Sequence, residues 1–158
     1  MARYLRGLGL LGQMADKWQE GQAAAPLAPL GAVWPSLMHL DWAAVGMAMR
    51  AGAANDSDAI GVTGVFAAIA ETGTLMMASG PQSPATTSLL PETHIAIVPA
   101  HRIVAHMEDG FALARAELGE LPRAINFISG PSRTGDIEQT IVLGAHGPYR
   151  VHVIVLEQ

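Results

Sequence analysis

The sequence predicts an α/β fold in which helices flank a sheet, and three observations support that prediction. Short apolar runs rich in Val and Ile, typical of buried strands, alternate with segments whose apolar residues recur at helical spacing. Hydrophobic residues make up 50% of the 158 positions and charged residues only 15%, so the chain can bury a core. Glycine and proline stand between the runs, as they do at turns. A chain of this length fits a single domain.

The predicted domain consists of a lead-in and a core. Residues 1–36 are expected to be irregular or helical, because residues 22–35 are rich in proline and alanine and no strand pattern is evident. Residues 37–158 are expected to form the α/β core. Its first element is a predicted helix over residues 41–49, which Asp41 can cap.

The rest of the core is predicted to alternate between strands and helices. A helix is expected over residues 103–118, where one face is apolar and a glycine and a proline follow. A brief turn or helix is expected at residues 87–91. The predicted strands lie within residues 60–70, 74–78, 94–98, 124–128 and 149–156.

The segment GPSRTGDIE (residues 130–138) is predicted to bind a small carboxylate or phosphate. It follows a predicted strand, and residues 137–144 are predicted to form a helix because Ile137 and Ile141 share one helical face. The start of such a helix offers unpaired backbone N–H groups and the positive end of the helix dipole, beside the guanidinium of Arg133. The predicted ligand-binding residues here are Gly130, Ser132, Arg133, Thr134 and Asp136.

A structural interpretation of the same segment stays open. Ser132 or Thr134 could simply cap the predicted helix. Arg133 could then pair with a neighbouring carboxylate at the surface instead of a ligand.

A second candidate site is the segment Glu71-Thr72-Gly73, which interrupts an apolar stretch. A functional Glu71 would act as a general base or a carboxylate nucleophile, whereas a structural one would accept backbone N–H groups in a strand-to-strand turn. Thr72 and Gly73 are predicted to contact the ligand, since glycine lets a ligand approach the backbone closely. We expect Glu71 and Arg133 to lie in one cleft, because breaks at neighbouring strand ends converge. His146, the second catalytic candidate beside Glu71, is expected as a third member of that site.

The composition excludes several classes of function. The formal net charge of −5 leaves no basic stripe for nucleic acid. The absence of cysteine excludes disulfides, thiolate zinc sites and iron–sulfur ligation by this chain, and the six histidines lack the spacing of a metal site. No run approaches the ~20 apolar residues that span a bilayer. We therefore expect a cytoplasmic protein that binds no metal, nucleic acid or membrane.

Four motifs occur in order along the chain. They are Ala70-Glu71-Thr72-Gly73-Thr74-Leu75, Leu90-Pro91-Glu92-Thr93-His94-Ile95, the segment from Asn126 to Glu138, and Gly144-Ala145-His146-Gly147-Pro148. Together they resemble the lactate-utilisation protein C family, whose members carry the LUD domain. The resemblance runs from about Leu40 to the C-terminus. The family usually has alanine where Gly135 stands.

The resemblance implies a Rossmann-like sheet, similar to that of the ribose-phosphate isomerase and coenzyme A transferase group. Family members usually have a further strand and helix upstream, so the resemblance also predicts that this chain lacks the first strand–helix segment. Such a sheet would have an exposed edge, which invites pairing into a homo-oligomer.

Two classes of function follow from the resemblance. In the first, the chain is the subunit without iron–sulfur clusters in a three-protein system that oxidises L-lactate to pyruvate. The clusters are then carried by the iron–sulfur partner subunits, and this chain binds no cofactor. In the second, the chain is an enzyme similar to coenzyme A transferases, which use a glutamate in a context like Glu71-Thr72-Gly73. Only 9 residues are Lys or Arg, few for the phosphates of coenzyme A, which favours the subunit.

Overall fold

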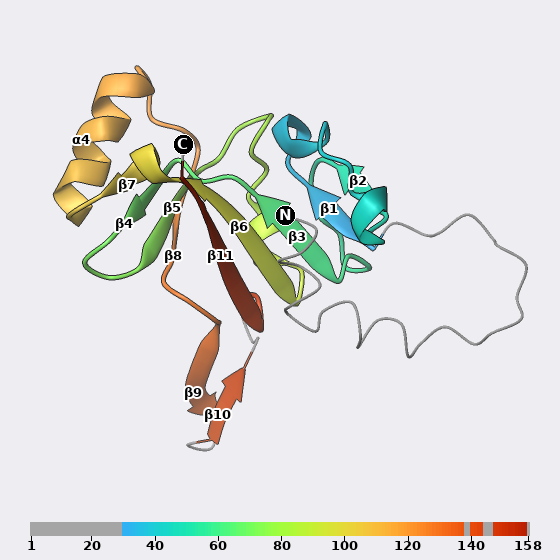
Figure 1. Cartoon of the computed structure of the whole chain (residues 1–158). Coiled ribbons are helices and arrows are strands. Elements are labelled where there is room, and N and C mark those ends of the chain that lie inside the picture. Colours follow the sequence, from blue (N-terminus) through green and yellow to red (C-terminus); the bar gives the residue numbers. More distant parts are fainter. Residues whose placement is uncertain (1–29, 138–139, 144–146, 158) are drawn as a thin grey trace, which may run out of the picture.

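The computed structural model describes residues 30–137, 140–143 and 147–157. Its main sheet has five parallel strands in the order β11-β6-β3-β1-β2 (Figure 1). The strands are β1 (Gly31–Val33), β2 (Met49–Ala51), β3 (Ile60–Thr63), β6 (Thr93–Pro99) and β11 (Arg150–Leu156). β3 and nearly all of β6 are buried, as expected for parallel strands that are covered on both faces. The predicted α/β class is confirmed.

A second sheet and a hairpin complete the β structure. The second sheet has the order β7-β4-β5-β8, in which β4 and β7 are parallel and β5 is antiparallel to both of its neighbours. Figure 1 shows the hairpin of β9 and β10 projecting away from both sheets. The strands are β4 (Ala67–Ile69), β5 (Thr74–Ala78), β7 (Ile103–Val104), β8 (Ile125–Ile128), β9 (Arg133–Ile137) and β10 (Thr140–Leu143).

The helices among the described residues are few and short. In this part of the chain the α-helices are α3 (Thr86–Leu89) and α4 (Met107–Glu117), and the 3₁₀ turns are η1 (Pro35–Leu37), η2 (Ala43–Val45) and η3 (Ala100–Arg102). Within the described ranges, none of these helices has the length and apolar character that crossing a bilayer requires.

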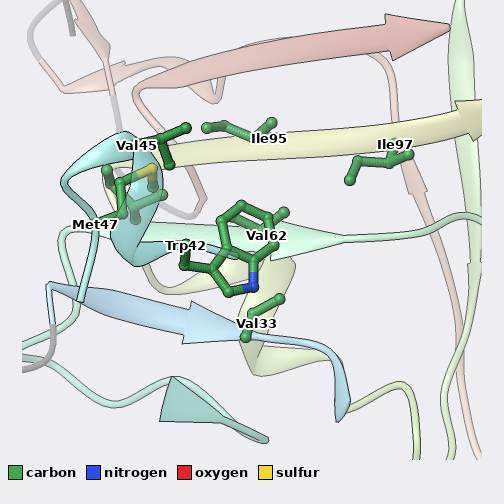
Figure 2. Packing of buried hydrophobic residues seen from close by; sticks show 8 residues of the cluster. Val33, Trp42, Val45, Met47, Val62, Ile95 and Ile97 are labelled. Atoms are coloured by element: carbon green, nitrogen blue, oxygen red, sulfur yellow. The ribbon is translucent and has the colours of Figure 1, made fainter. Parts of the chain in front are cut away.

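The first hydrophobic cluster covers one face of the main sheet (Figure 2). The chain around η2 provides Trp42, Val45 and Met47, which lie over buried side chains from three parallel strands. The strand residues in the cluster are Val33, Ile60, Val62, Ile95 and Ile97. An irregular segment therefore covers this face, where a longer helix would be usual in an α/β fold.

The other face of the main sheet packs against the second sheet. Ala96 and Val98 on β6 contact a cluster that contains Leu75 and Met77 of β5 and Ile128 of β8. The outer face of the second sheet is in turn covered by α4, through a third cluster of Ala67, Ile69, Met76 and Ala114. The order of layers is thus main sheet, second sheet and α4.

The strands predicted from apolar runs are confirmed. The run 60–70 forms β3 and β4, and the runs 74–78, 94–98, 124–128 and 149–156 form β5, β6, β8 and β11. The turn or helix expected at residues 87–91 corresponds to α3. Of the long helix expected over 103–118, only α4 is helical, because Ile103 and Val104 pair with β4 instead.

The helix predicted over residues 137–144 is wrong. Residues 133–137 and 140–143 form strands β9 and β10, which pair antiparallel. The sequence of β10, Thr-Ile-Val-Leu, is rich in β-branched residues, which lose χ1 freedom in a helix and pack well on a pleated strand. Ile137 and Ile141 therefore lie on two different short strands, and their helical spacing does not reflect a helix.

Two predictions for the front of the chain are also wrong. β1 lies within the stretch expected to be an irregular lead-in, and it pairs with β2 on one side and β3 on the other. The helix expected over 41–49 is reduced to η2, after which Gly46 adopts a φ of 72° and the chain enters β2. Asp41 does act as predicted, since its Oδ1 accepts the N–H of Ala44 at 3.0 Å.

A buried histidine gives the fold a pH dependence. His94 on β6 is fully buried, and its Nε2 lies 2.8 Å from Oγ1 of Thr63, while no described residue bonds to its Nδ1. Burial disfavours the charged ring and lowers the pKa of His94 from 6.5 to about 4. The folded state therefore requires the neutral ring, whereas the unfolded chain takes up a proton below pH 6.5.

We expect acid to destabilise the fold through His94. The free energy of unfolding should fall by up to roughly 3 kcal/mol as the pH drops from the ordinary pKa of a histidine to the folded value. In His94→Gln, which cannot titrate, this part of the change in unfolding free energy with pH should vanish, although the fold is weaker at neutral pH. Urea titrations at several pH values measure the free energy of unfolding and its slope against pH. The exposed-histidine variant His39→Gln should keep the wild-type slope, and an unchanged slope in His94→Gln would contradict the assignment.

Candidate functional site

Glu71 lies in the turn between β4 and β5, where it contacts the start of α4. Its Oε1 accepts the backbone N–H of Met107 at 2.9 Å, and its Oε2 lies 3.0 Å from Nδ1 of His106. The backbone N–H of His106 in turn donates to Oδ2 of Asp109 at 3.0 Å. Glu71 thus satisfies a backbone donor that the helix leaves free, in the manner of a capping residue.

The pair of Glu71 and His106 is half-exposed and electrostatically coupled. The hydrogen bond from His106, and then that from the Met107 N–H, lowers the pKa of Glu71. The same hydrogen bond and the charge of Glu71 raise the pKa of His106. The charged pair therefore forms above the pKa of the carboxyl and is lost as the pH rises through the raised pKa of His106.

A chain of hydroxyl groups connects the Glu71 turn to the GPSRTGDIE segment. Oγ1 of Thr72 lies 2.8 Å from Oγ1 of Thr74, which lies 2.7 Å from Oγ of Ser129. This follows from the register of β5 and β8, in which Leu75 is opposite Ile128. The turn before β5 and the turn after β8 are therefore adjacent.

Glycine shapes both of these turns. Gly73 has a φ of 63° and Gly130 a φ of 123°, backbone angles that residues with a side chain rarely adopt. An added Cβ would meet nothing within 4 Å at either position. The backbone conformation, and not crowding, therefore requires glycine at these two turns.

The GPSRTGDIE segment also meets the chain that leads into β11. The N–H of Ser132 donates to the carbonyl of Pro148 at 2.9 Å, and a Cβ added to Gly147 would lie 3.4 Å from that of Ser132. His146 lies outside the described residues, as do the side chains of Thr134 and Asp136. The backbone of the third motif is thus joined to the end of the fourth.

The second motif joins the same set through Arg150. Nε of Arg150 donates to Oγ1 of Thr93 at 2.9 Å, and its Nη2 lies 3.5 Å from Oε2 of Glu92. The backbone N–H of Arg150 donates to the carbonyl of Glu92 at 2.9 Å. These contacts tie the start of β11 to the start of β6.

Arg133 is exposed at the start of β9, not at a helix N-terminus. The helix dipole and free N–H groups that supported an anion site there are therefore absent from the described backbone. Arg133 was also the expected cation beside Glu71, and that position is taken by His106. In the parts of the chain that the structure describes, no ion pair engages the Arg133 guanidinium.

Three residues that contact the predicted set were missed from the sequence. The spacing of His106 from the other histidines does not indicate a site, but Asp109 three residues later is a signal that His106 precedes a helix. Ser129 and Arg150 offered no signal of their own, since their contacts depend on strand register. Among the described residues, no three or more His, Asp or Glu side chains gather closely enough to hold a metal ion.

Comparison with known proteins places these motifs in a family. A family model described as the LUD domain matches residues 41–156. The chain belongs to the LUD domain family. All four motifs lie within the matched part of this LUD domain protein, whereas β1 precedes it.

Curated relatives of this LUD domain protein are named Lactate utilization protein C. That of Bacillus licheniformis is 37% identical over 156 residues, which cover 94% of this chain and 57% of the relative. That of Halalkalibacterium halodurans is 43% identical over 101 residues, which cover 62% of this chain and 44% of the relative. The chain thus spans about half the length of the curated relatives that it matches.

A solved structure has the same fold as this LUD domain protein. The crystal structure of a DUF162 family protein from Deinococcus radiodurans, at 1.70 Å resolution, aligns with a TM-score of 0.55 and covers 95% of this chain and 83% of the other. The two sequences are 22% identical, so this likeness supports the arrangement of strands and helices alone.

The coupling of Glu71 and His106 can be measured by NMR titration of the histidine rings. We expect the wild-type His106 ring to titrate above the ordinary 6.5, because the carboxylate stabilises its charged form. Glu71→Gln should lower the pKa of His106, whereas Glu120→Gln, which removes an exposed carboxylate from the loop after α4, should leave it unchanged. A His106 pKa that does not respond to Glu71→Gln would contradict the pair.

Proposed function

We propose that this LUD domain protein takes part in lactate utilisation as a subunit that carries no iron–sulfur cluster of its own. The proposal is supported by the 37% identity to a Lactate utilization protein C across 94% of this chain. The chain has no cysteine, so clusters that serve lactate oxidation would belong to iron–sulfur partner subunits. We further propose that it works in the cytoplasm.

The contacts between the four motifs support a shared role for them. Thr74 contacts Ser129, Ser132 contacts Pro148, and Arg150 contacts Thr93. The third motif thus touches the first and the fourth, and the second motif touches Arg150, two residues after the fourth, although the motifs are dispersed over some eighty residues of sequence. Residues that meet in this way can form one binding surface, for a partner or for a small ligand.

Within that role we propose that Arg133 binds a small carboxylate. The side chain of Arg133 is exposed, so its guanidinium is accessible to a ligand, and a charge-assisted hydrogen bond to a carboxylate is among the stronger ones. Arginine can bind both oxygens of a carboxylate in one plane. Lactate is the ligand that the names of the relatives suggest, and pyruvate is the carboxylate that its oxidation yields.

The geometry of Glu71 argues against the coenzyme A transferase alternative. Both of its carboxylate oxygens are already engaged, one by the Met107 N–H and the other by His106. A nucleophilic Glu71 would have to leave both partners and uncap α4 before it could attack. We therefore favour the role of Glu71 as a structural cap.

The subunit role predicts stable partners. The tagged full chain, purified without oxygen from the extract of its own cells grown on L-lactate, should carry along cysteine-rich proteins with the absorption of iron–sulfur clusters. Mass spectrometry would identify them, and the same tag on an unrelated protein provides the control. Recovery of the chain alone, repeatedly and from lactate-grown cells, would contradict the subunit role.

The carboxylate site predicts a ligand effect that depends on Arg133. Pyruvate or L-lactate should raise the melting temperature of the wild type, because a ligand that binds only the folded state stabilises it. Arg133→Ala should abolish that rise and leave the unliganded melting temperature nearly unchanged, since the side chain is exposed. Arg123→Ala, which removes another exposed arginine, should keep the rise. If Arg133→Ala lowers the unliganded melting temperature instead, the residue is structural.

A further inference from the structure

Strand β11 is a long, regular edge strand of the main sheet. All seven of its residues are in register with β6, from Arg150 opposite Thr93 to Leu156 opposite Pro99. No described strand pairs with its other side, and Figure 1 shows it in front of β6 at the end of the sheet. Its outer backbone N–H and C=O groups can therefore pair with another strand.

This edge lacks the features that usually prevent strand pairing. Edge strands in soluble proteins are commonly short, bulged, or protected by lysine or proline. β11 is seven residues long, without a register shift, and contains neither lysine nor proline. Three of its apolar residues are substantially exposed, namely Val153 (40%), Val155 (49%) and Leu156 (40%).

The side chains of β11 are arranged so that the strand complements itself. Val151 packs into the cluster between the two sheets, so Val153 and Val155 lie on the same face of the strand. Antiparallel pairing of two copies about Val153 would place Val153 opposite itself and Val151 opposite Val155. β-branched residues directly opposite one another stabilise antiparallel pairs. This register therefore makes a continuous row of valines across both copies.

The charges at the ends of β11 also favour antiparallel pairing of two copies. Arg150 begins β11 and Glu157 follows its last residue, and both are exposed. Antiparallel pairing brings the Arg150 end of one copy close to the Glu157 end of the other, whereas parallel pairing would bring like charges together. A two-fold axis relates the two strands of such a pair, so the assembly is complete with two chains.

We propose that β11 is the dimerisation edge of this protein, where a second copy of the chain pairs antiparallel about Val153 and extends the main sheet across both copies. The partner is the same chain because β11 is complementary to an antiparallel copy of itself, both in its row of valines and in the charges at its ends. An interface of one strand per copy is small, so the dimer is reversible and its fraction rises with concentration. This inference does not depend on the proposed role in lactate utilisation.

Single cysteines test the register directly, because the chain has no cysteine of its own. Residues directly opposite in an antiparallel pair have Cα atoms about 4.5–5.5 Å apart, within the range of a disulfide. Val153→Cys should form a disulfide-linked dimer under mild oxidation, and Val151→Cys should not, since its two copies would lie about 13 Å apart along the strands. A mixture of Val151→Cys and Val155→Cys chains should cross-link to each other. Leu121→Cys, at an exposed position (73%) outside β11, should stay unlinked.

Sedimentation equilibrium supplies a second, independent measurement. The wild type should approach twice the chain mass of 16.5 kDa as the concentration rises. Val153→Lys should remain at the single-chain mass, because two lysines would face each other on the axis, while an equal mixture of Val153→Lys and Val153→Asp should recover the double mass. Circular dichroism melts check that each variant folds. A wild type that stays at 16.5 kDa up to its solubility limit, or equal cross-linking of Val153→Cys and Leu121→Cys, overturns the proposal.

Discussion

Strand β6 is the element on which the rest of the structure depends, because it places side chains in the clusters on both faces of the main sheet. Ile95 and Ile97 pack into the cluster under η2, and Ala96 and Val98 pack into the cluster between the sheets. Its two edges pair with β3 and β11. A strand that is buried on both faces and paired on both sides can shift in neither direction without moving its apolar residues out of the core. The positions of the surrounding turns follow from that fixed register.

Hydrogen bonds whose geometry depends on strand register join the first motif to the third and the second motif to the start of β11. The antiparallel pairing of β5 and β8 brings Thr74 to Ser129, and the parallel pairing of β6 and β11 brings Arg150 to Thr93. Neither contact involves residues that are near in sequence. The polar contacts are individually modest, at about 1 kcal/mol for a neutral hydrogen bond. The apolar clusters therefore supply the stability, and the polar contacts fix which turns lie together.

The fold was largely predictable from the sequence where burial produced a long apolar run, and unpredictable where pairing decided the outcome. The buried runs of β5 and β6 gave clear signals. β1 is only three residues long and is stabilised by strands on both sides, which a local pattern cannot reveal. Ile137 in β9 and Ile141 in β10 have helical spacing, but the β-branched composition of β10 and its pairing with β9 favour strands. At the candidate site, the structural alternative for Glu71 was foreseen, but its partner His106 depends on where α4 begins.

The contacts of Ser132 and Arg150 place the candidate ligand site at one end of β11, the strand proposed as the dimer edge. Both contacts lie at the amino end of β11, where Pro148 receives the Ser132 N–H and Arg150 reaches Thr93. In an antiparallel pair about Val153, the two Arg150 residues would be six residues apart along the shared strands, or about 20 Å at the usual rise. The two candidate sites would then lie at opposite ends of one interface. Each could be occupied independently, while a change in the register of β11 would alter both together.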